Sequence, residues 1–137
     1  EGADMNTTDI SGRTALMFAA EGNHSGAAAV LLNNGARSDA QDEDGETALM
    51  KAVAEGHLET ASVLLEKGAE PKIKDENGWT ALMRAARNGD ATMMDLLLRK
   101  GADINDKNEL GETALMIAEK NSRQTAADLL RDHQRQR

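Results

Sequence analysis

The sequence predicts an all-α repeat solenoid, with four stacked helix-turn-helix-hairpin repeats preceded by a partial N-terminal repeat. The main observation is a Gly-x-Thr-Ala-Leu-Met block that recurs at a constant spacing, beginning at positions 12, 45, 78 and 111. A fixed period between about 20 and 50 residues is typical of stacked-repeat architectures. The second observation is the scarcity of aromatic residues, with Phe18 and Trp79 alone. The interior is therefore expected to consist of Leu, Ala, Met and Val between slim, closely packed helices.

The repeat divides a single domain, residues 1–137, into five segments. The first residues, Gly2 to Asn6, align with Gly101 to Asn105 and resemble the tail of a repeat whose helices are missing. The expected segments are the partial-repeat tail at 1–11, repeats at 12–44, 45–77 and 78–110, and a C-terminal capping repeat at 111–137. Each repeat would bury its apolar side against the next one, as solenoids do.

Residues 45–77 serve as the template for one repeat. The acidic residues before Gly45 favour a tight turn, and the Thr47 hydroxyl is placed to cap the first helix. Gly56 is expected to end that helix in the left-handed conformation. A second helix is expected from about residue 57 to 67, closed by Gly68, and an extended stretch then leads to the next turn. Neither helix is long enough to be stable alone in water, so stacking must hold them.

At this level of detail the chain resembles the ankyrin-repeat family, whose repeat has about 33 residues and a Thr-Pro-Leu-His-x-Ala signature. The resemblance covers nearly the whole chain and departs from the signature at two positions of every repeat. The family's proline is alanine here, and its histidine is methionine, at Met17, Met50, Met83 and Met116. In the family that histidine helps to tie neighbouring hairpins by hydrogen bonds. We expect the methionines to pack in the interior and to replace part of that network.

The two ends of the array are expected to differ. The first repeat has no covering neighbour, and Gly26 interrupts a second helix that is poor in large side chains. We therefore expect the N-terminal repeat to be the most mobile one, or to be covered by another chain, with self-association as one route. The last helix and tail are polar, as a capping repeat needs. The C-terminus thus looks like a natural end, and the beginning looks truncated.

Composition argues against several classes of function. The formal net charge of −8 opposes binding to nucleic acid or to an anionic membrane surface. Without cysteine there is no disulfide, thiolate metal site or cysteine nucleophile. A calcium loop aligned on Gly45 would have Lys51 at the acidic twelfth position, so a structural turn is favoured. His24 and His57 open second helices, where a structural role is expected. We expect no catalysis, cofactor or metal, and a cytoplasmic location, with secreted and periplasmic locations left open.

The resemblance implies a partner-binding surface on the concave side, formed by hairpin tips and exposed positions of the first helices. Trp79 stands at the centre of this array and is a residue type enriched in interface hot spots. Acidic tips around a floor carrying Lys51, Arg84 and Arg87 would make one edge negative and the floor partly positive. The candidate partner-binding residues are Arg13, Phe18, Glu43, Asp44, Glu46, Lys51, Glu55, Glu76, Trp79, Arg84, Arg87, Asn88, Leu110, Glu112, Ile117 and Lys120.

The leading functional hypothesis is a non-catalytic module that binds another protein on this concave surface. Two alternatives stay open on the sequence alone. One is a regulatory domain of a larger enzyme, and the other is an engineered scaffold, which the regular repeat blocks favour. Irregularities such as Asn23, where positions 56 and 89 carry glycine, favour a natural origin.

Overall fold

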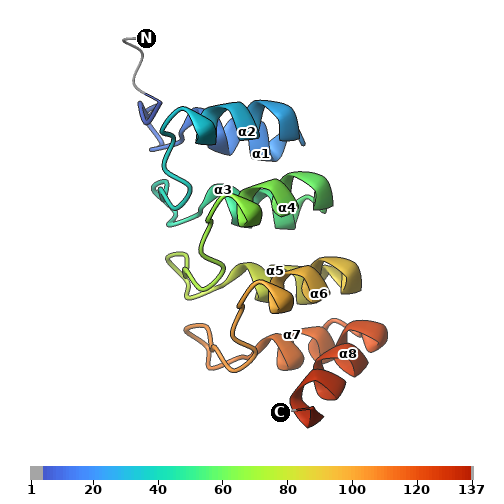
Figure 1. Cartoon of the computed structure of the whole chain (residues 1–137). Helices are drawn as coiled ribbons and strands as arrows, with labels where there is room; N and C mark the ends of the chain where they lie inside the picture. The colour runs from blue at the N-terminus through green and yellow to red at the C-terminus, as the bar shows by residue number, and fades with distance from the viewer. Residues whose placement is uncertain (1–4, 137) are drawn as a thin grey trace.

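The computed structural model describes residues 5–136 as a stack of four helix pairs, one above the other, with loops projecting from one side (Figure 1). No strand occurs within these residues. The expected partial-repeat tail at positions 2–4 lies outside the described residues, whereas Met5 and Asn6 form a turn. The helices are α1 Ala15–Glu21, α2 Ser25–Asn33, α3 Ala48–Ala54, α4 Leu58–Glu66, α5 Ala81–Asn88, α6 Ala91–Arg99, α7 Ala114–Lys120 and α8 Gln124–Arg135.

Each odd-numbered helix begins directly after a threonine whose side-chain oxygen accepts a hydrogen bond from the third residue of the helix. This bond, predicted at Thr47, is 3.2 Å long there and 3.3 Å long at Thr14, Thr80 and Thr113. It satisfies one of the amides that a helix start leaves without an intrahelical partner. The threonine before each Ala-Leu-Met run therefore sets the start of the helix.

The methionines of the repeated block do more than fill space. At Met17 and Met83 the thioether sulfur accepts a hydrogen bond from the backbone N–H of the preceding capping threonine, at an N···S distance of 3.4 Å. The capping hydrogen bonds are therefore reciprocal in α1 and α5. The methionines were expected to pack in the interior, and at these two positions they also accept a hydrogen bond, because thioether sulfur is a weak acceptor. These bonds lie within one repeat and do not join neighbouring hairpins.

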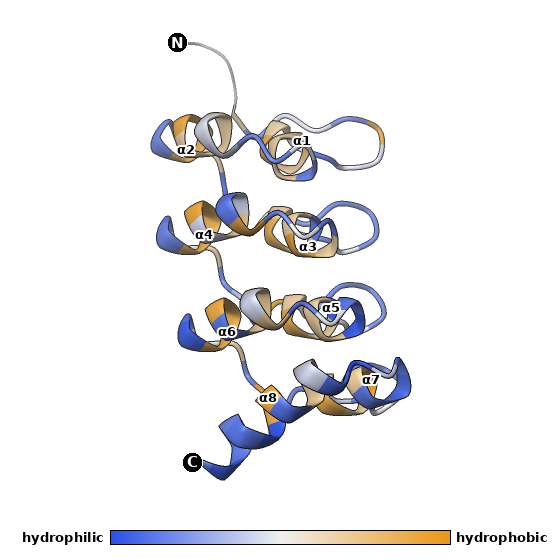
Figure 2. Ribbon diagram, turned by 90° about the vertical axis from the view of Figure 1, so that its right-hand side faces the viewer, coloured by the Kyte–Doolittle hydropathy of each residue, from blue (hydrophilic) through white to orange (hydrophobic). Residues whose placement is uncertain are grey.

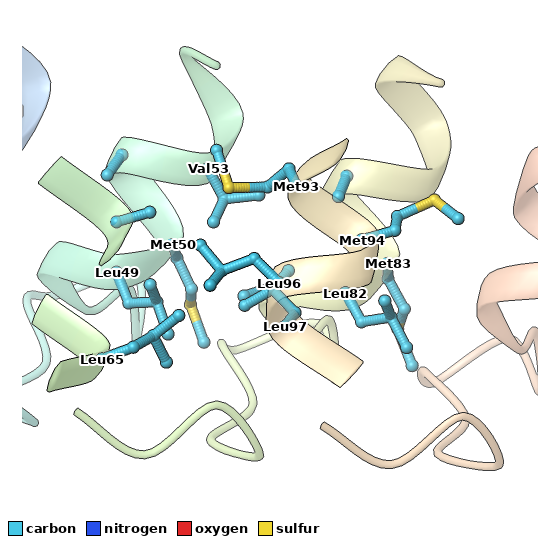
Figure 3. Packing of buried hydrophobic residues seen from close by; sticks show 14 of the residues in the cluster. Leu49, Met50, Val53, Leu65, Leu82, Met83, Met93, Met94, Leu96 and Leu97 are labelled. Carbon is cyan, nitrogen blue, oxygen red and sulfur yellow. The ribbon is translucent and has the colours of Figure 1, made fainter. Parts of the chain in front are cut away.

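The interior runs the length of the stack between odd- and even-numbered helices. Leu64, Leu97 and Leu130 have no exposed surface, as their equivalence predicts. Met93 and Met94 are likewise fully buried. Figure 3 shows how α6 inserts its side chains toward α3 and α4 on one side and toward α5 on the other. One continuous aliphatic cluster therefore holds the helix pairs in register.

The two end faces of the stack break the equivalence of the repeats. Ala15 is exposed, whereas Ala48 is 2 % exposed, and Leu31 is partly buried where its equivalents are fully buried. At the other end Met116 is 48 % exposed, so the expectation that it packs in the interior is wrong. Met50 and Met83 are 1 % exposed because a further helix pair follows each of them, and none follows Met116 in the described chain.

A candidate binding surface on the hairpin tips

Four equivalent hairpins project beside α1, α3, α5 and α7, and we call their tips together with the adjoining exposed side of these helices the tip face (Figures 1 and 2). Each hairpin is closed by one side chain. Oδ1 of Asp42 accepts hydrogen bonds from the backbone N–H groups of Asp44 and Glu46, at 3.0 and 2.9 Å. The same pair of bonds is made by the residues at positions 9, 75 and 108. This turn chemistry is local in sequence, so every repeat presents its tip in the same way.

Neighbouring tips are also joined to one another through the backbone. The N–H of Glu43 donates to the carbonyl oxygen of Ser11 at 2.9 Å, and the N–H of Glu76 donates to that of Asp44 at 3.0 Å. The N–H of Glu109 donates to the carbonyl oxygen of Asn77 at 3.1 Å. The tips therefore form a continuous ledge that is ordered before any partner arrives.

Lys51, expected on the exposed floor, is buried behind this ledge. Its side chain is 7 % exposed, and Nζ lies 2.8 Å from Oδ2 of Asp42, 3.0 Å from Oε1 of Glu46 and 3.6 Å from Oε2 of Glu21. An ammonium group surrounded by carboxylates in this way is not available to a partner. The prediction that Lys51 lies on the partner-binding surface is corrected, because its long stem turns back to the acidic residues that head its own hairpin.

Arg84, the equivalent of Lys51 in the next repeat, is held in the same way. Nη2 contacts Oδ2 of Asp75 and lies 3.0 Å from Oε2 of Glu46. Glu46 thus joins both cations and links two repeats. The expected positive floor is therefore neutralised by carboxylates of the chain, and of the three predicted central cations Arg87 alone is exposed.

Burial and ion pairing oppose each other in setting the pKa values of this network. Burial acts to raise the pKa of Asp42, but the hydrogen bond from Lys51, the backbone N–H groups and the Lys51 charge together hold that pKa below its ordinary value. Burial acts to lower the pKa of Lys51, yet hydrogen bonds to Asp42 and Glu46 and their charges raise it. Both groups therefore stay ionised around neutral pH, and the network is a structural support for the ledge.

The aromatic residues of the tip face each lie against an arginine. The guanidinium carbon of Arg87 lies 5.2 Å from the centre of the Trp79 ring, and that of Arg13 lies 4.6 Å from the centre of the Phe18 ring. Phe18 is 47 % exposed, and Trp79 is partly buried against the core. Both rings therefore pack partly on the protein itself and present a cationic group beside an aromatic surface.

A hollow of about 520 Å³ lies on the tip face between the second and third hairpins. Its lining contains the indole of Trp79, the neutralised Arg84 and the exposed Arg87. Carboxylates from both hairpins and one amide complete it. The full lining is Asp44, Glu46, Asp75, Glu76, Asn77, Trp79, Arg84 and Arg87.

The remaining sequence-predicted residues fall into three groups by exposure. Ile117 is 1 % exposed and belongs to the core cluster, so its prediction as a surface residue is wrong, whereas Phe18 at the equivalent position of the first repeat is 47 % exposed. Arg13, Glu46 and Glu112 are half-buried. The exposed residues are Glu43, Asp44, Glu55, Glu76, Asn88, Leu110 and Lys120, of which Asn88 donates to the carbonyl of Ala54 and Lys120 pairs with Glu112.

Sequence reasoning assigned the acidic residues before Gly45 to a turn and missed that Asp42 pairs with Lys51 and Asp75 with Arg84. The signal was present as a spacing of nine residues, from Asp42 to Lys51 and from Asp75 to Arg84. In the last repeat the corresponding residues, Asn108 and Ile117, are both uncharged. In the first repeat the same two positions hold Asp9 and Phe18, so the pairing of opposite charges at this spacing occurs in the second and third repeats.

The described residues contain neither a membrane-spanning helix nor a cluster of metal ligands. Across residues 5–136 no helix is both long and apolar enough to cross a membrane. Within the same span, three or more His, Cys, Asp or Glu side chains nowhere come together in a way that would hold a metal ion.

Paired helices stacked in register, with linked hairpins along one edge, define a helical-repeat scaffold that presents an extended surface. The comparison with family models agrees with that class. A model described as ankyrin repeats (3 copies) matches the chain over two ranges, residues 1–75 and 67–136. The chain therefore belongs to the ankyrin-repeat family. A comparison with curated proteins gave no match. Ankyrin repeats are in general protein–protein interaction modules and are typically non-catalytic.

Proposed function

We propose that this chain binds a segment of another protein along the tip face, with no chemistry of its own. The observation that carries the proposal is the hollow of about 520 Å³ over the ordered ledge, with Trp79 and the exposed Arg87 in its lining. Tryptophan and arginine are the residue types most enriched among interface hot spots. A ledge already held by hydrogen bonds loses little conformational freedom on binding, which favours affinity.

The ion network defines which side chains serve this function. Lys51 and Arg84 support the ledge, because their charges are taken up by carboxylates of the chain. The residues left to contact a partner are the exposed ones and the partly buried Trp79, with Phe18, Trp79 and Arg87 as the principal anchors. A test of binding should therefore leave Lys51 and Arg84 intact, since their removal would disturb the fold itself.

The experiment is a display selection of peptides and small domains on the whole chain, followed by affinity measurements on two double variants. Trp79→Ala with Arg87→Ala removes the anchors of the hollow. Leu58→Ala with Arg99→Ala removes an apolar and a basic residue from a groove between α4 and α6, and serves as the matched control. We expect independently selected binders to lose about thirtyfold or more in affinity for the first variant, and less than about threefold for the second.

Binders that keep their affinity for the first variant and lose it for the second would contradict the proposal. Circular dichroism and thermal unfolding of both variants establish that each one is folded before affinities are compared. Because Trp79 is partly buried, a Trp79→Phe variant is included to separate loss of the ring from loss of the indole N–H.

A further inference from the structure

Asp44 and Glu76 form a like-charged pair where the second and third hairpin tips meet. The N–H of Glu76 donates to the carbonyl oxygen of Asp44, so the two residues are adjacent across the junction, and both are exposed. The negative charge of Asp44 is the largest cause of a pKa of Glu76 above its ordinary value. Burial, a side-chain hydrogen bond with Asp44 and the charges of Asp75 and Asp42 act in the same direction.

The other two tip junctions of the described chain avoid this repulsion. At these junctions the backbone N–H groups of Glu43 and Glu109 make the same hydrogen bond, but the residues that accept it, Ser11 and Asn77, are uncharged. Uncharged residues are therefore compatible with the position that Asp44 occupies. A charge placed beside another like charge is destabilising, so the central junction is less favourable for folding than its neighbours.

The described chain supplies no cation to this pair. Its basic side chains near the ledge are engaged elsewhere: Lys51 with Asp42 and Glu46, and Arg84 with Glu46 and Asp75. Arg87 lies against the ring of Trp79. None of the ion pairs among residues 5–136 includes Asp44 or Glu76.

Asp44 and Glu76 also line the hollow beside Trp79. The lining carries four carboxylates and two guanidinium groups. With Arg84 taken up internally, the rim at Asp44 and Glu76 remains negative. An occupant with a cationic end and an apolar stem matches this arrangement, because the charge can lie between the carboxylates while the stem packs on the indole.

We propose that the partner is a basic protein segment that places a lysine or arginine side chain between Asp44 and Glu76, with its stem against Trp79. This inference rests on the proposed function of the tip face and adds the chemistry of the partner. Binding of the cation would relieve the repulsion between the two carboxylates. The unfavourable charge pair at the centre of the ledge is thus a feature of recognition, kept at the expense of stability.

The first test uses the selected binders in a double-mutant cycle. Each lysine or arginine of a binder is replaced in turn by an uncharged isostere, citrulline for arginine, and titrated against wild type, Asp44→Asn and Glu76→Gln. We expect one cationic residue whose replacement weakens binding to wild type about fivefold and has no further effect in Asp44→Asn. Glu43→Gln and Glu109→Gln change the net charge equally at other junctions and should lower affinity less than about twofold.

The outcomes separate the two proposals. Binders that require Trp79 and Arg87, but whose cationic residue couples as strongly to Glu43 and Glu109 as to Asp44 and Glu76, would overturn the inference of a basic segment. The proposed binding surface would then still stand. Binders that do not require Trp79 and Arg87 would overturn the proposed function first. Asp44→Asn should unfold at the same temperature as wild type or higher at pH 7, and a lower unfolding temperature would contradict the repulsion argument.

A second test needs no selected binder. Acetyl-arginine amide is titrated into the isotopically labelled protein, with acetyl-citrulline amide as the uncharged control. Amide shifts confined to the Asp44, Glu76 and Asn77 region, seen with the arginine derivative and lost in Asp44→Asn, would support the inference. The same shifts from calcium chloride at lower concentration would overturn it in favour of a divalent metal ion.

Discussion

Replacing Lys51 with methionine is expected to destabilise the protein through the carboxylate that it leaves behind. Methionine keeps an unbranched side chain and a high helix propensity, so α3 itself should be little affected. The Asp42 side chain, however, is 3 % exposed and would lose its nearest cation, now at 2.8 Å. Glu46 would keep Arg84, whose Nη2 lies 3.0 Å away.

The size of the expected loss of stability depends on which contacts of Asp42 remain in the Lys51→Met variant. Removing one partner of a buried ion pair costs about 3–5 kcal/mol. Asp42 would retain two backbone hydrogen bonds, from the N–H groups of Asp44 and Glu46, which satisfy part of its charge. We therefore expect a loss of about 3 kcal/mol, the lower end of that range. Lys120→Met is the control, because that lysine is 60 % exposed and its pair should contribute less than about 1 kcal/mol.

The assay is urea unfolding followed by circular dichroism, repeated across pH. The pKa of Asp42 is lowered in the folded wild type, so its stabilising contribution is present above its unfolded pKa and is lost as pH falls through its folded pKa. In Lys51→Met the same buried carboxyl lacks its cation and becomes easier to protonate. The difference in free energy of unfolding between wild type and variant should therefore be constant near neutral pH and become smaller below about pH 4.

A loss of under about 0.5 kcal/mol at pH 7 would refute the reasoning, since it would mean that the Asp42 carboxylate does not depend on Lys51. A difference that grows on acidification would refute it as well. The double variant Asp42→Asn with Lys51→Met should recover part of the loss, because the uncompensated buried charge is then gone.

Two further predictions compare residues that are equivalent in the repeat but differ in their surroundings, and both are measured by the same unfolding assay. Met50→Ala should cost about 3 kcal/mol by leaving a cavity, whereas Met116→Ala should cost less than about 1 kcal/mol because that side chain is half exposed; equal losses would contradict the end effect. Gly45→Ala should be more destabilising than Gly111→Ala. Both glycines have a positive φ that disfavours any side chain. A Cβ at Gly45 would lie 2.8 Å from the backbone nitrogen of Glu76 in the next tip, and one at Gly111 would meet nothing within 4 Å. Similar losses would exclude a role for the tip-to-tip contact.

Much of the architecture could be predicted because its causes are local in sequence. The capping bond of Thr47 spans three residues, and the turn bonds of Asp42 span two and four. Gly56 adopts a positive φ, in the left-handed region that its place at the helix end requires. Leu64 is buried because the repeat period places a neighbour on each side of it.

The candidate site was predicted less completely because exposure there depends on contacts between repeats. Lys51 and Arg84 occupy surface positions by period, and both are held by carboxylates that include one from the preceding repeat, Glu21 for Lys51 and Glu46 for Arg84. Ile117 occupies the same position and is buried. Position within the repeat therefore predicted which residues share a row, but not which of them face the solvent.

The amino-acid sequence by itself determined the repeat, the turns, the helix starts and the aliphatic interior, since each arises from interactions within a few residues or from strict periodicity. The tertiary structure alone decided which charged side chains of the described residues are paired within the chain and which remain exposed without an ion-pair partner. Glu46 and Arg84 are 38 residues apart and meet through stacking, and Asp44 faces Glu76 for the same reason. The interaction energy of two charged groups depends on the distance between them, and for groups of different repeats the stacking sets that distance. A charged group within hydrogen-bonding distance of an opposite charge is neutralised, and one beyond that distance remains available to a partner.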